Sequence, residues 1–382
     1  MLPLTSSELW QKRGMRRAAT ALRRPLSSLA RRPQSHLQPE TQEVLDGVLA
    51  GSRAALARAV TLVESSRADD CAEAEALLAA LPAPSLRTLR LGVCGPPGVG
   101  KSSFVEALGA RLLDGGFGVA VLAIDPSSRR LGGSILGDRT RMPELGRRTF
   151  VRPSPAKGHL GGVAAHTHAA VALCESAGHD VVIVESVGVG QSELAIDDVA
   201  DVVVLLLPPA GGDDLQGVKA GIMEIADVVA VTKDDGSTAA AATRALGDVR
   251  RALRGASASR AKHGDAWRPV ALKCSAARAP ETVGGVWAAA LDCRAALGGG
   301  AVGGDGRLSV LDGPLLARRR GQRAASTWDL ARRSLLDAFE RDADVRALFD
   351  GALGADLDAA RATPRDAARA LVDAFLATRR VT

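Results

Sequence analysis

The residues with the clearest chemistry in this 382-residue sequence form a glycine-rich stretch at positions 95–103. The stretch matches the pattern G-x-x-x-x-G-K-[ST] and consists of Gly95, Pro96, Pro97, Gly98, Val99, Gly100, Lys101, Ser102 and Ser103. Glycines let a loop wrap its backbone N–H groups around phosphates, and a helix N-terminus behind the loop adds partial positive charge. Lys101 would then bridge the β- and γ-phosphates, and the Ser102 hydroxyl would ligate Mg²⁺. An apolar run at 89–94 and a helical pattern at 103–113 supply the strand and helix that this motif requires.

An acidic residue follows a second apolar run, at 181–184. Glu185 is succeeded three residues later by Gly188, an order typical of a strand that ends on a magnesium-organising carboxylate, with Glu where Asp is commoner. We expect Glu185 to act through water because its side chain is longer. The Gly188 N–H can sense the γ-phosphate, so this loop should order with a triphosphate and relax after hydrolysis. No Gln directly follows Gly188, and Gln191 lies three residues on, which predicts slow intrinsic hydrolysis.

A guanine-specifying pattern follows the apolar run at 228–231. Thr232, Lys233 and Asp235 form a version of [NT]-K-x-D. Asp235 has the spacing to accept hydrogen bonds from the N1–H and exocyclic amine of guanine, and adenine lacks these donors. The Lys233 stem would lie along the base plane. A later loop, whose backbone N–H groups would contact guanine O6, consists of Ser275, Ala276 and Ala277. These elements predict GTP rather than ATP as the ligand.

Two aspartates lie between the phosphate loop and Glu185. Asp125 closes the apolar run at 119–124, and Asp138 lies in a polar stretch. Each could reach the magnesium shell or could instead serve a turn or a helix cap. The candidate magnesium ligands are therefore Ser102, Asp125, Asp138 and Glu185.

The histidines and cysteines predict no further metal centre. His166 and His168 are one residue apart, so they face away from each other on a helix and chelate poorly. Surface or local hydrogen-bonding roles are expected for His159, His166, His168 and His179. Five widely spaced cysteines without a C-x-x-C pair argue against a disulfide framework and a structural zinc site, and Cys94 and Cys274 are expected in the core.

The order of apolar runs predicts an α/β fold. Short β-branched runs at 89–94, 119–124, 150–152, 181–184, 202–207, 228–231 and 270–274 alternate with helical patterns. This alternation is typical of a P-loop NTPase with a mostly parallel sheet and helices on both faces. Helical patterns also occupy 42–66, 72–80, 317–340, 343–349 and 364–377. The expected organisation is a transit peptide (1–39), an N-terminal helical lobe (40–86), a P-loop G domain (87–296), a flexible linker (297–314) and a C-terminal helical dimerisation arm (315–382).

The net charge of +6 comes from the N-terminus. Residues 1–39 contain eight Lys or Arg residues and one acidic residue, so the remainder is close to neutral, and nucleic acid is not an expected partner. An Arg-rich, Ser-containing leader that is almost free of acidic residues is typical of an organellar transit peptide; the alternatives are a basic tail without a function and a twin-arginine signal, for which the hydrophobic segment is missing. No apolar run is long enough for a membrane helix.

With these motifs in place the sequence resembles the methylmalonyl-CoA mutase-associated GTPases, which include the ArgK-type proteins. The resemblance runs from about Leu45 to Phe375. It is carried by the blocks at 125–128, 132–138, 152–155, 161–163, 185–193 and 208–221. Thr232 stands where Asn is general, as in the mitochondrial members of the family, and Ser103 where Thr is commoner.

The resemblance implies a homodimeric G protein that binds adenosylcobalamin-dependent methylmalonyl-CoA mutase. It would gate cofactor loading from cobalamin adenosyltransferase and protect or reactivate the mutase, with no tightly bound cobalamin of its own. Residues 211–219 resemble an additional switch loop, from which Lys219 would swing toward the nucleotide, and Asp125, Asp138 and Glu185 fall on magnesium and switch positions. The mitochondrial matrix is the expected location. The alternatives are a metal-delivery GTPase, which would need a Cys/His cluster, and a transport-associated kinase.

Overall fold

A parallel β-sheet organises the protein. The computed structural model describes residues 37–65, 67–83, 85–125, 142–155, 160–186, 195–209, 220–256, 262–263, 266–299, 308, 312–359 and 361–377. The strands are β1 Leu89–Cys94, β2 Val119–Asp125, β3 Phe150–Pro155, β4 Val181–Ser186, β5 Val202–Leu207, β6 Val228–Val231 and β7 Val270–Lys273. They pair in parallel in the order β3-β2-β4-β1-β5-β6-β7. The prediction of a mostly parallel sheet built from seven apolar runs is confirmed.

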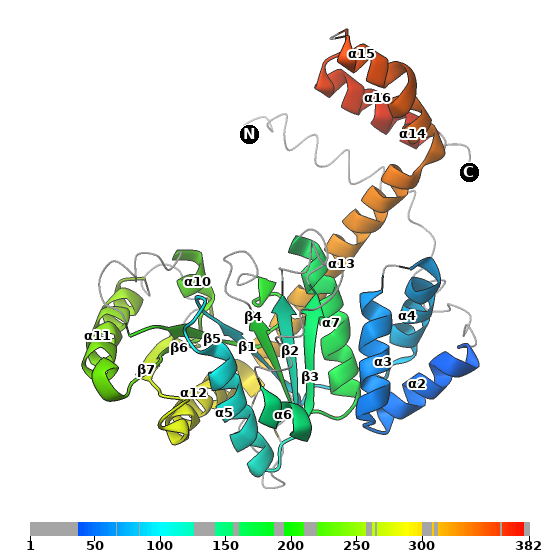
Figure 1. The fold of residues 1–382 in the computed structure, drawn as a ribbon. Coiled ribbons are helices and arrows are strands. Elements are labelled where there is room, and N and C mark those ends of the chain that lie inside the picture. Colours follow the sequence, from blue (N-terminus) through cyan, green and yellow to red (C-terminus); the bar gives the residue numbers. More distant parts are fainter. Residues whose placement is uncertain are drawn as a thin grey trace, which may run out of the picture.

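Alternation along the strands creates two cores. Leu89, Leu91 and Val93 of β1 pack on one face, and Cys94 packs on the other, because successive side chains of a strand point to opposite sides. The first face is covered by α5 Lys101–Asp114, α6 Pro143–Arg148 and α12 Val283–Arg294. The second is covered by α7 Leu160–Ser176, α10 Ala220–Ile225 and α11 Ala239–Ala256. Helices thus lie on both faces, as predicted (Figure 1).

In the described part of the chain, the sheet is preceded by α2 Pro39–Leu49, α3 Arg53–Glu64 and α4 Ala68–Ala80. The prediction of one helical stretch over 42–66 is wrong, because the chain breaks at Gly51, whose φ is 74°, and Ser52 caps α3 by accepting from the Ala55 N–H. In Figure 1 these helices lie beside α7 at the β3 edge.

Polar contacts fasten the N-terminal helices to the sheet edge. The Arg152 guanidinium on β3 lies 2.6 Å from the carboxylate of Glu64. On α7, the His166 Nδ1 atom lies 2.7 Å from the Val63 carbonyl oxygen. His166 therefore has a hydrogen-bonding role, but its partner lies 103 positions away on α3 and is not local in sequence.

The C-terminal part is helical: α13 Gly313–Arg341, α14 Ala343–Leu348, α15 Gly354–Asp358 and α16 Pro364–Ala377. The first turns of α13 pack on the sheet domain, and the rest of the helix projects away and carries the last three helices at its end (Figure 1). We call α13–α16 the arm. Phe339 and Phe375 meet edge to face at 5.2 Å between ring centres, which joins α16 to the end of α13. Within the described residues, no helix has the length and apolarity needed to cross a membrane.

Candidate nucleotide-binding site

The phosphate-binding loop emerges from the carboxyl end of β1 and leads into α5. Gly95, Gly98 and Gly100 have φ angles of 147°, 73° and 102°, which side-chain-bearing residues rarely adopt. A Cβ on Gly95 would also lie 2.4 Å from the Leu206 carbonyl oxygen of β5, whereas Gly98 and Gly100 have open space around them. The glycines are thus required by backbone conformation, and the first one also by its close approach to the neighbouring strand.

Lys101 lies inside this loop. Its side chain is 7% exposed, and its ammonium group donates to the carbonyl oxygens of Gly95 and Pro96 at 2.8 and 3.0 Å. These contacts hold the positive charge over the concave side of the loop, where a phosphate would lie. The phosphate-bridging role of Lys101 stays a prediction.

Two of the candidate magnesium ligands are brought together. β4 neighbours β1, with Glu185 paired with Val93, and the Ser102 hydroxyl donates to Glu185 Oε1 at 3.0 Å. A hydroxyl beside a carboxylate that is 6% exposed provides the oxygen ligands that Mg²⁺ prefers, so these residues fit the ion. Asp125 ends β2 in register with Pro155.

Several predicted site residues lie outside the described residues. They are Asp138, Gly188, Gln191 and Lys219, together with the side chain of Asp125. Their roles stay predictions.

The guanine motif is fastened to the phosphate-binding loop. Thr232, 5% exposed, donates from its hydroxyl to the carbonyl oxygens of Val99 and Leu207 at 2.8 and 3.2 Å. Lys233 has a φ of 55°, and its ammonium group donates to the Gly98 carbonyl oxygen at 3.0 Å. Thr232 and Lys233 thus connect the ends of β6 and β1, which the sequence alone does not reveal.

Asp235 lies where β6 and β7 end. It accepts a hydrogen bond from the Ser275 hydroxyl, and the Arg278 guanidinium lies 3.6 Å from its other oxygen. Both predicted guanine elements therefore meet in space, with Ala276 and Ala277 directly after Ser275. Sequence reasoning missed Arg278, although a basic residue three positions after Ser275 was a signal.

His159 lies outside the described residues, whereas packing and local bonds account for His168, His179 and the buried cysteines. His179 Nδ1 lies 2.9 Å from the Cys174 carbonyl oxygen, and burial lowers the pKa of His168 to about 4. Cys94 and Cys274 are buried, as predicted. Among the described residues, no group of three or more His, Cys, Asp or Glu side chains is arranged to hold a metal ion.

A seven-stranded parallel sheet, with this loop after β1, a carboxylate at the end of β4 and a guanine motif after β6, defines the class of P-loop GTPases. The family model for the methylmalonyl-CoA mutase-associated GTPase MeaB matches residues 56–343. The chain belongs to this family.

Individual relatives agree with the family assignment. A mouse protein named methylmalonic aciduria type A homolog, mitochondrial, is 40% identical over 312 residues, covering 78% of this chain and 71% of its own length. A putative GTPase of Caulobacter vibrioides is 44% identical over 303 residues, covering 79% and 87%. The solved structure of a LAO/AO transport system kinase superposes with a TM-score of 0.64 at 32% identity, covering 90% of this chain and all of that chain.

Proposed function

We propose that this GTPase is a chaperone of adenosylcobalamin-dependent methylmalonyl-CoA mutase, whose GTP hydrolysis gates cofactor loading and protects or reactivates the mutase. The observation that carries the proposal is the family match over residues 56–343. The mouse relative, with its name referring to methylmalonic aciduria, supports it further. Cobalamin adenosyltransferase is the proposed second partner.

In this proposal Lys101 leaves the loop carbonyls and bridges the β- and γ-phosphates, where its charge stabilises the transition state. Ser102 and Glu185 would hold Mg²⁺, which neutralises phosphate charge when bound. Asp235, held in place by Ser275, would accept from guanine. The Gly188 N–H, Gln191 and Lys219 would complete the site when the mutase binds, and Asp125 and Asp138 are the further magnesium candidates.

Association with purified methylmalonyl-CoA mutase tests the chaperone role. The full chain is immobilised and offered the mutase with GDP, with a non-hydrolysable GTP analogue and without nucleotide. We expect nucleotide-dependent capture and faster GTP hydrolysis in the presence of the mutase. Failure to associate in every nucleotide state would refute the chaperone role and leave the GTPase assignment standing.

A second candidate function follows from the description of the solved relative as a LAO/AO transport system kinase. A GTPase transfers the γ-phosphate to water, whereas a kinase transfers it to an acceptor. GTP labelled in the γ-phosphate, incubated with the protein and the mutase, should release free phosphate only. Label that stays on protein in proportion to turnover would favour the kinase.

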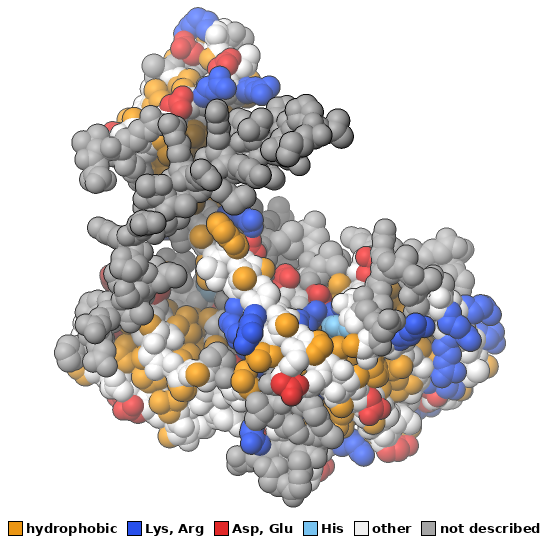
Figure 2. Space-filling model, turned by 180° about the vertical axis from the view of Figure 1, so that it is seen from behind, with side chains coloured by type: hydrophobic (Ala, Val, Ile, Leu, Met, Phe, Trp, Pro, Cys, Tyr) orange, Lys and Arg blue, Asp and Glu red, His pale blue; other side chains and the backbone are white. Residues whose placement is uncertain are grey.

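The proposed homodimer has a candidate surface on the arm. The exposed length of α13 carries Trp328, Leu335 and Leu336, which are 68%, 62% and 58% exposed. Hydrophobic side chains are visible on this length of the arm in Figure 2. Residues seven and eight apart share a helix face, so a second copy could cover Trp328 and Leu335 together. Sedimentation equilibrium should give a dimer for the native chain and a monomer for the W328A and L335S double variant, with D337A, at an exposed position on the opposite side of α13, as a control.

The location that we propose is the mitochondrial matrix. The Arg-rich residues 1–39 and the mitochondrial name of the mouse relative support it. Import of the full chain into isolated mitochondria, with shortening of the protein, tests this location.

A further inference from the structure

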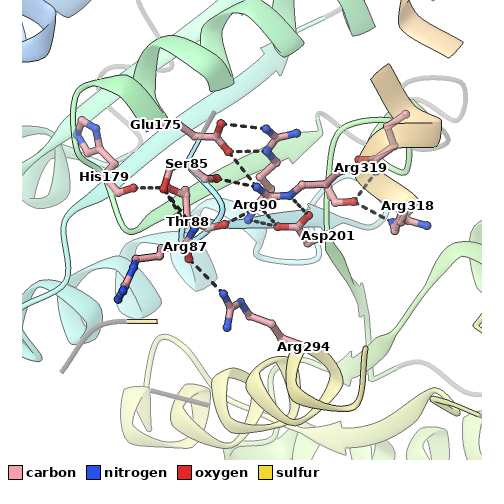
Figure 3. Close-up of polar contacts among 12 residues, drawn as sticks. Ser85, Arg87, Thr88, Arg90, Glu175, His179, Asp201, Arg294, Arg318 and Arg319 are labelled. Atoms are coloured by element: carbon pink, nitrogen blue, oxygen red, sulfur yellow. Dashed lines mark hydrogen bonds and ion pairs between the residues drawn. The ribbon is translucent and has the colours of Figure 1, made fainter. Parts of the chain in front are cut away.

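A buried ion pair joins the arm to the sheet at the end where β1 and β5 begin, opposite the nucleotide site. Arg319, in the second turn of α13, is fully buried. Its Nε and Nη2 atoms donate to the two carboxylate oxygens of Asp201 at 2.7 and 2.5 Å. Asp201 directly precedes β5, and Figure 3 shows Arg319 reaching it from the arm. Arg319 also donates to the carbonyl oxygens of Ser85 and Thr88, before β1.

Residues 197–201 form a turn just before β5, the 197–201 turn. Arg318 and Gln322 of α13 also contact this turn. Arg318 donates to the Asp197 carboxylate at 2.6 Å and to its carbonyl oxygen at 2.9 Å. Gln322 Nε2 donates to the carbonyl oxygens of Asp197 and Ala200, both at 2.8 Å. Three side chains on one face of α13 therefore grip one turn.

The same turn is packed on β1. The Asp201 N–H donates to the Arg90 carbonyl oxygen at 2.8 Å, and the Arg90 N–H donates to Asp201 Oδ2 at 2.9 Å. Gly92, two residues after Arg90 on β1, lies so close to the turn and the residue before it that an added Cβ would be 2.3 Å from Ile196 and 3.0 Å from Ala200. β1 continues for two residues beyond Gly92 before the phosphate-binding loop begins.

The charges at this junction are almost fully withdrawn from water, and the buried guanidinium of Arg294 also interacts with the charges of Asp201 and Arg319. Glu175 of α7 pairs with Arg90 at 2.7 Å and with Arg319 at 3.5 Å, so Arg90, Arg319, Glu175 and Asp201 form a closed set of two positive and two negative groups (Figure 3). All four residues are at most 4% exposed. Separating such a set strands charges in a medium of low polarity, which is strongly unfavourable. Separating the base of α13 from the 197–201 turn and β1 would therefore be costly.

We propose that Arg318, Arg319 and Gln322 are positioning residues for GTP hydrolysis, which fix β1 and its phosphate-binding loop through the 197–201 turn. The inference rests on the GTPase activity of the chain. It makes the arm a thermodynamic partner of the nucleotide site. By linkage, a ligand that favours one arrangement of the loop also favours one arrangement of the α13 base, and the reverse holds equally.

The test uses the full chain with Arg318→Ala and Gln322→Ala together. These side chains grip the turn without belonging to the closed set of charges, so the fold should survive. Mutations along a coupling network change the coupling by roughly 2- to 30-fold. We expect kcat for GTP to fall within that range, while the affinity for GDP stays within a factor of about two. The ratio of affinities for a non-hydrolysable GTP analogue and GDP should shift by a similar factor.

The matched control is Arg332→Ala, which removes an exposed ion pair to Asp329 further along the same helix and should change none of these quantities. Arg318→Lys, which keeps the charge beside Asp197, should restore part of kcat. A folded double variant with native kcat and a native affinity ratio would overturn the inference. If the double variant does not fold, Gln322→Ala alone is judged by the same criteria. Absence of GTP binding and hydrolysis in the native chain would instead refute both the GTPase activity and the inference.

Discussion

Substitution of Gly92 by Ala tests the packing of the turn on β1. The backbone of Gly92 is not in the left-handed region, so Ala meets no conformational obstacle there. The added Cβ would lie 2.3 Å from Ile196 Cγ2 and 3.0 Å from Ala200 Cβ, whereas ordinary contacts lie at 3.4–4 Å. The turn or the strand must therefore move by about 1 Å, since protein cores are already close-packed.

The cost can be worked from general values for overpacked cores. An extra methyl group without space costs about 1–3 kcal/mol in the free energy of unfolding. Because the displaced residues also carry Asp201 and its ion pair, we expect the upper half of that range, about 2–3 kcal/mol. The displacement should lower kcat for GTP as well, since the same strand leads into the phosphate-binding loop.

Urea denaturation at equilibrium measures this prediction. Ile196→Ala removes the clashing methyl group, so the double variant with Gly92→Ala should lose at least 1 kcal/mol less than the sum of the two single losses, as expected of residues in contact. The control is Gly247→Ala in α11, where a Cβ meets nothing within 4 Å and helix propensity predicts a gain of about 1 kcal/mol. Native stability of the Gly92 variant, or strict additivity with Ile196→Ala, would refute the reasoning.

Three further predictions address the site and its surroundings. Thr232→Val removes the hydroxyl that donates to the Val99 carbonyl oxygen, whereas Leu207 still accepts from the Thr232 N–H; the loss should cost about 1–3 kcal/mol in urea denaturation. Thr327→Val, at an exposed helix position, should cost almost nothing. Asp235→Asn should weaken GDP binding by about 100-fold, because one charge-assisted hydrogen bond is lost and the other becomes neutral, and should strengthen xanthosine diphosphate binding in calorimetry; unchanged GDP affinity would contradict the assignment. Burial above all, and next the charge of Arg90, lowers the pKa of His168 to about 4 in the folded protein. As the pH falls, His168 is therefore protonated in the unfolded chain before it is protonated in the folded one. Stability should fall by about 2 kcal/mol from pH 7 to pH 5, and a His168→Asn variant with the same fall would disprove this.

The strands and the phosphate-binding loop were predictable because short-range signals determine them. Apolar β-branched runs mark the buried strands of a parallel sheet, and the glycines of the loop mark backbone conformations that other residues avoid. The division between α2 and α3 was missed, because the apolar spacing continues across it. Gly51 followed by Ser52 was the available signal for a helix end and a new cap.

The contacts of the arm could not be predicted from the sequence. Arg319 lies among several other arginines of a helix, and charged residues in helices are usually solvated. Only the fold reveals that Arg319 faces Asp201, a residue 118 positions away. Asp201 itself and Asp227 each precede an apolar strand, and each accepts a backbone N–H from the adjacent strand. Such pairings depend on strand order, which local patterns do not specify.

The length of α13 turns a small rotation at its base into a large displacement at its tip. The helix continues for 22 residues beyond Arg319 (341 − 319), which at the α-helical rise corresponds to about 33 Å. A tilt of about 10° at the base would therefore carry the tip through roughly 6 Å, about the distance of one helical turn. The arm is a lever whose fulcrum is the buried guanidinium of Arg319. A molecule that holds α14–α16 would need only modest force to act on the sheet, and a sub-ångström change in the sheet would be visible at the far end of the arm.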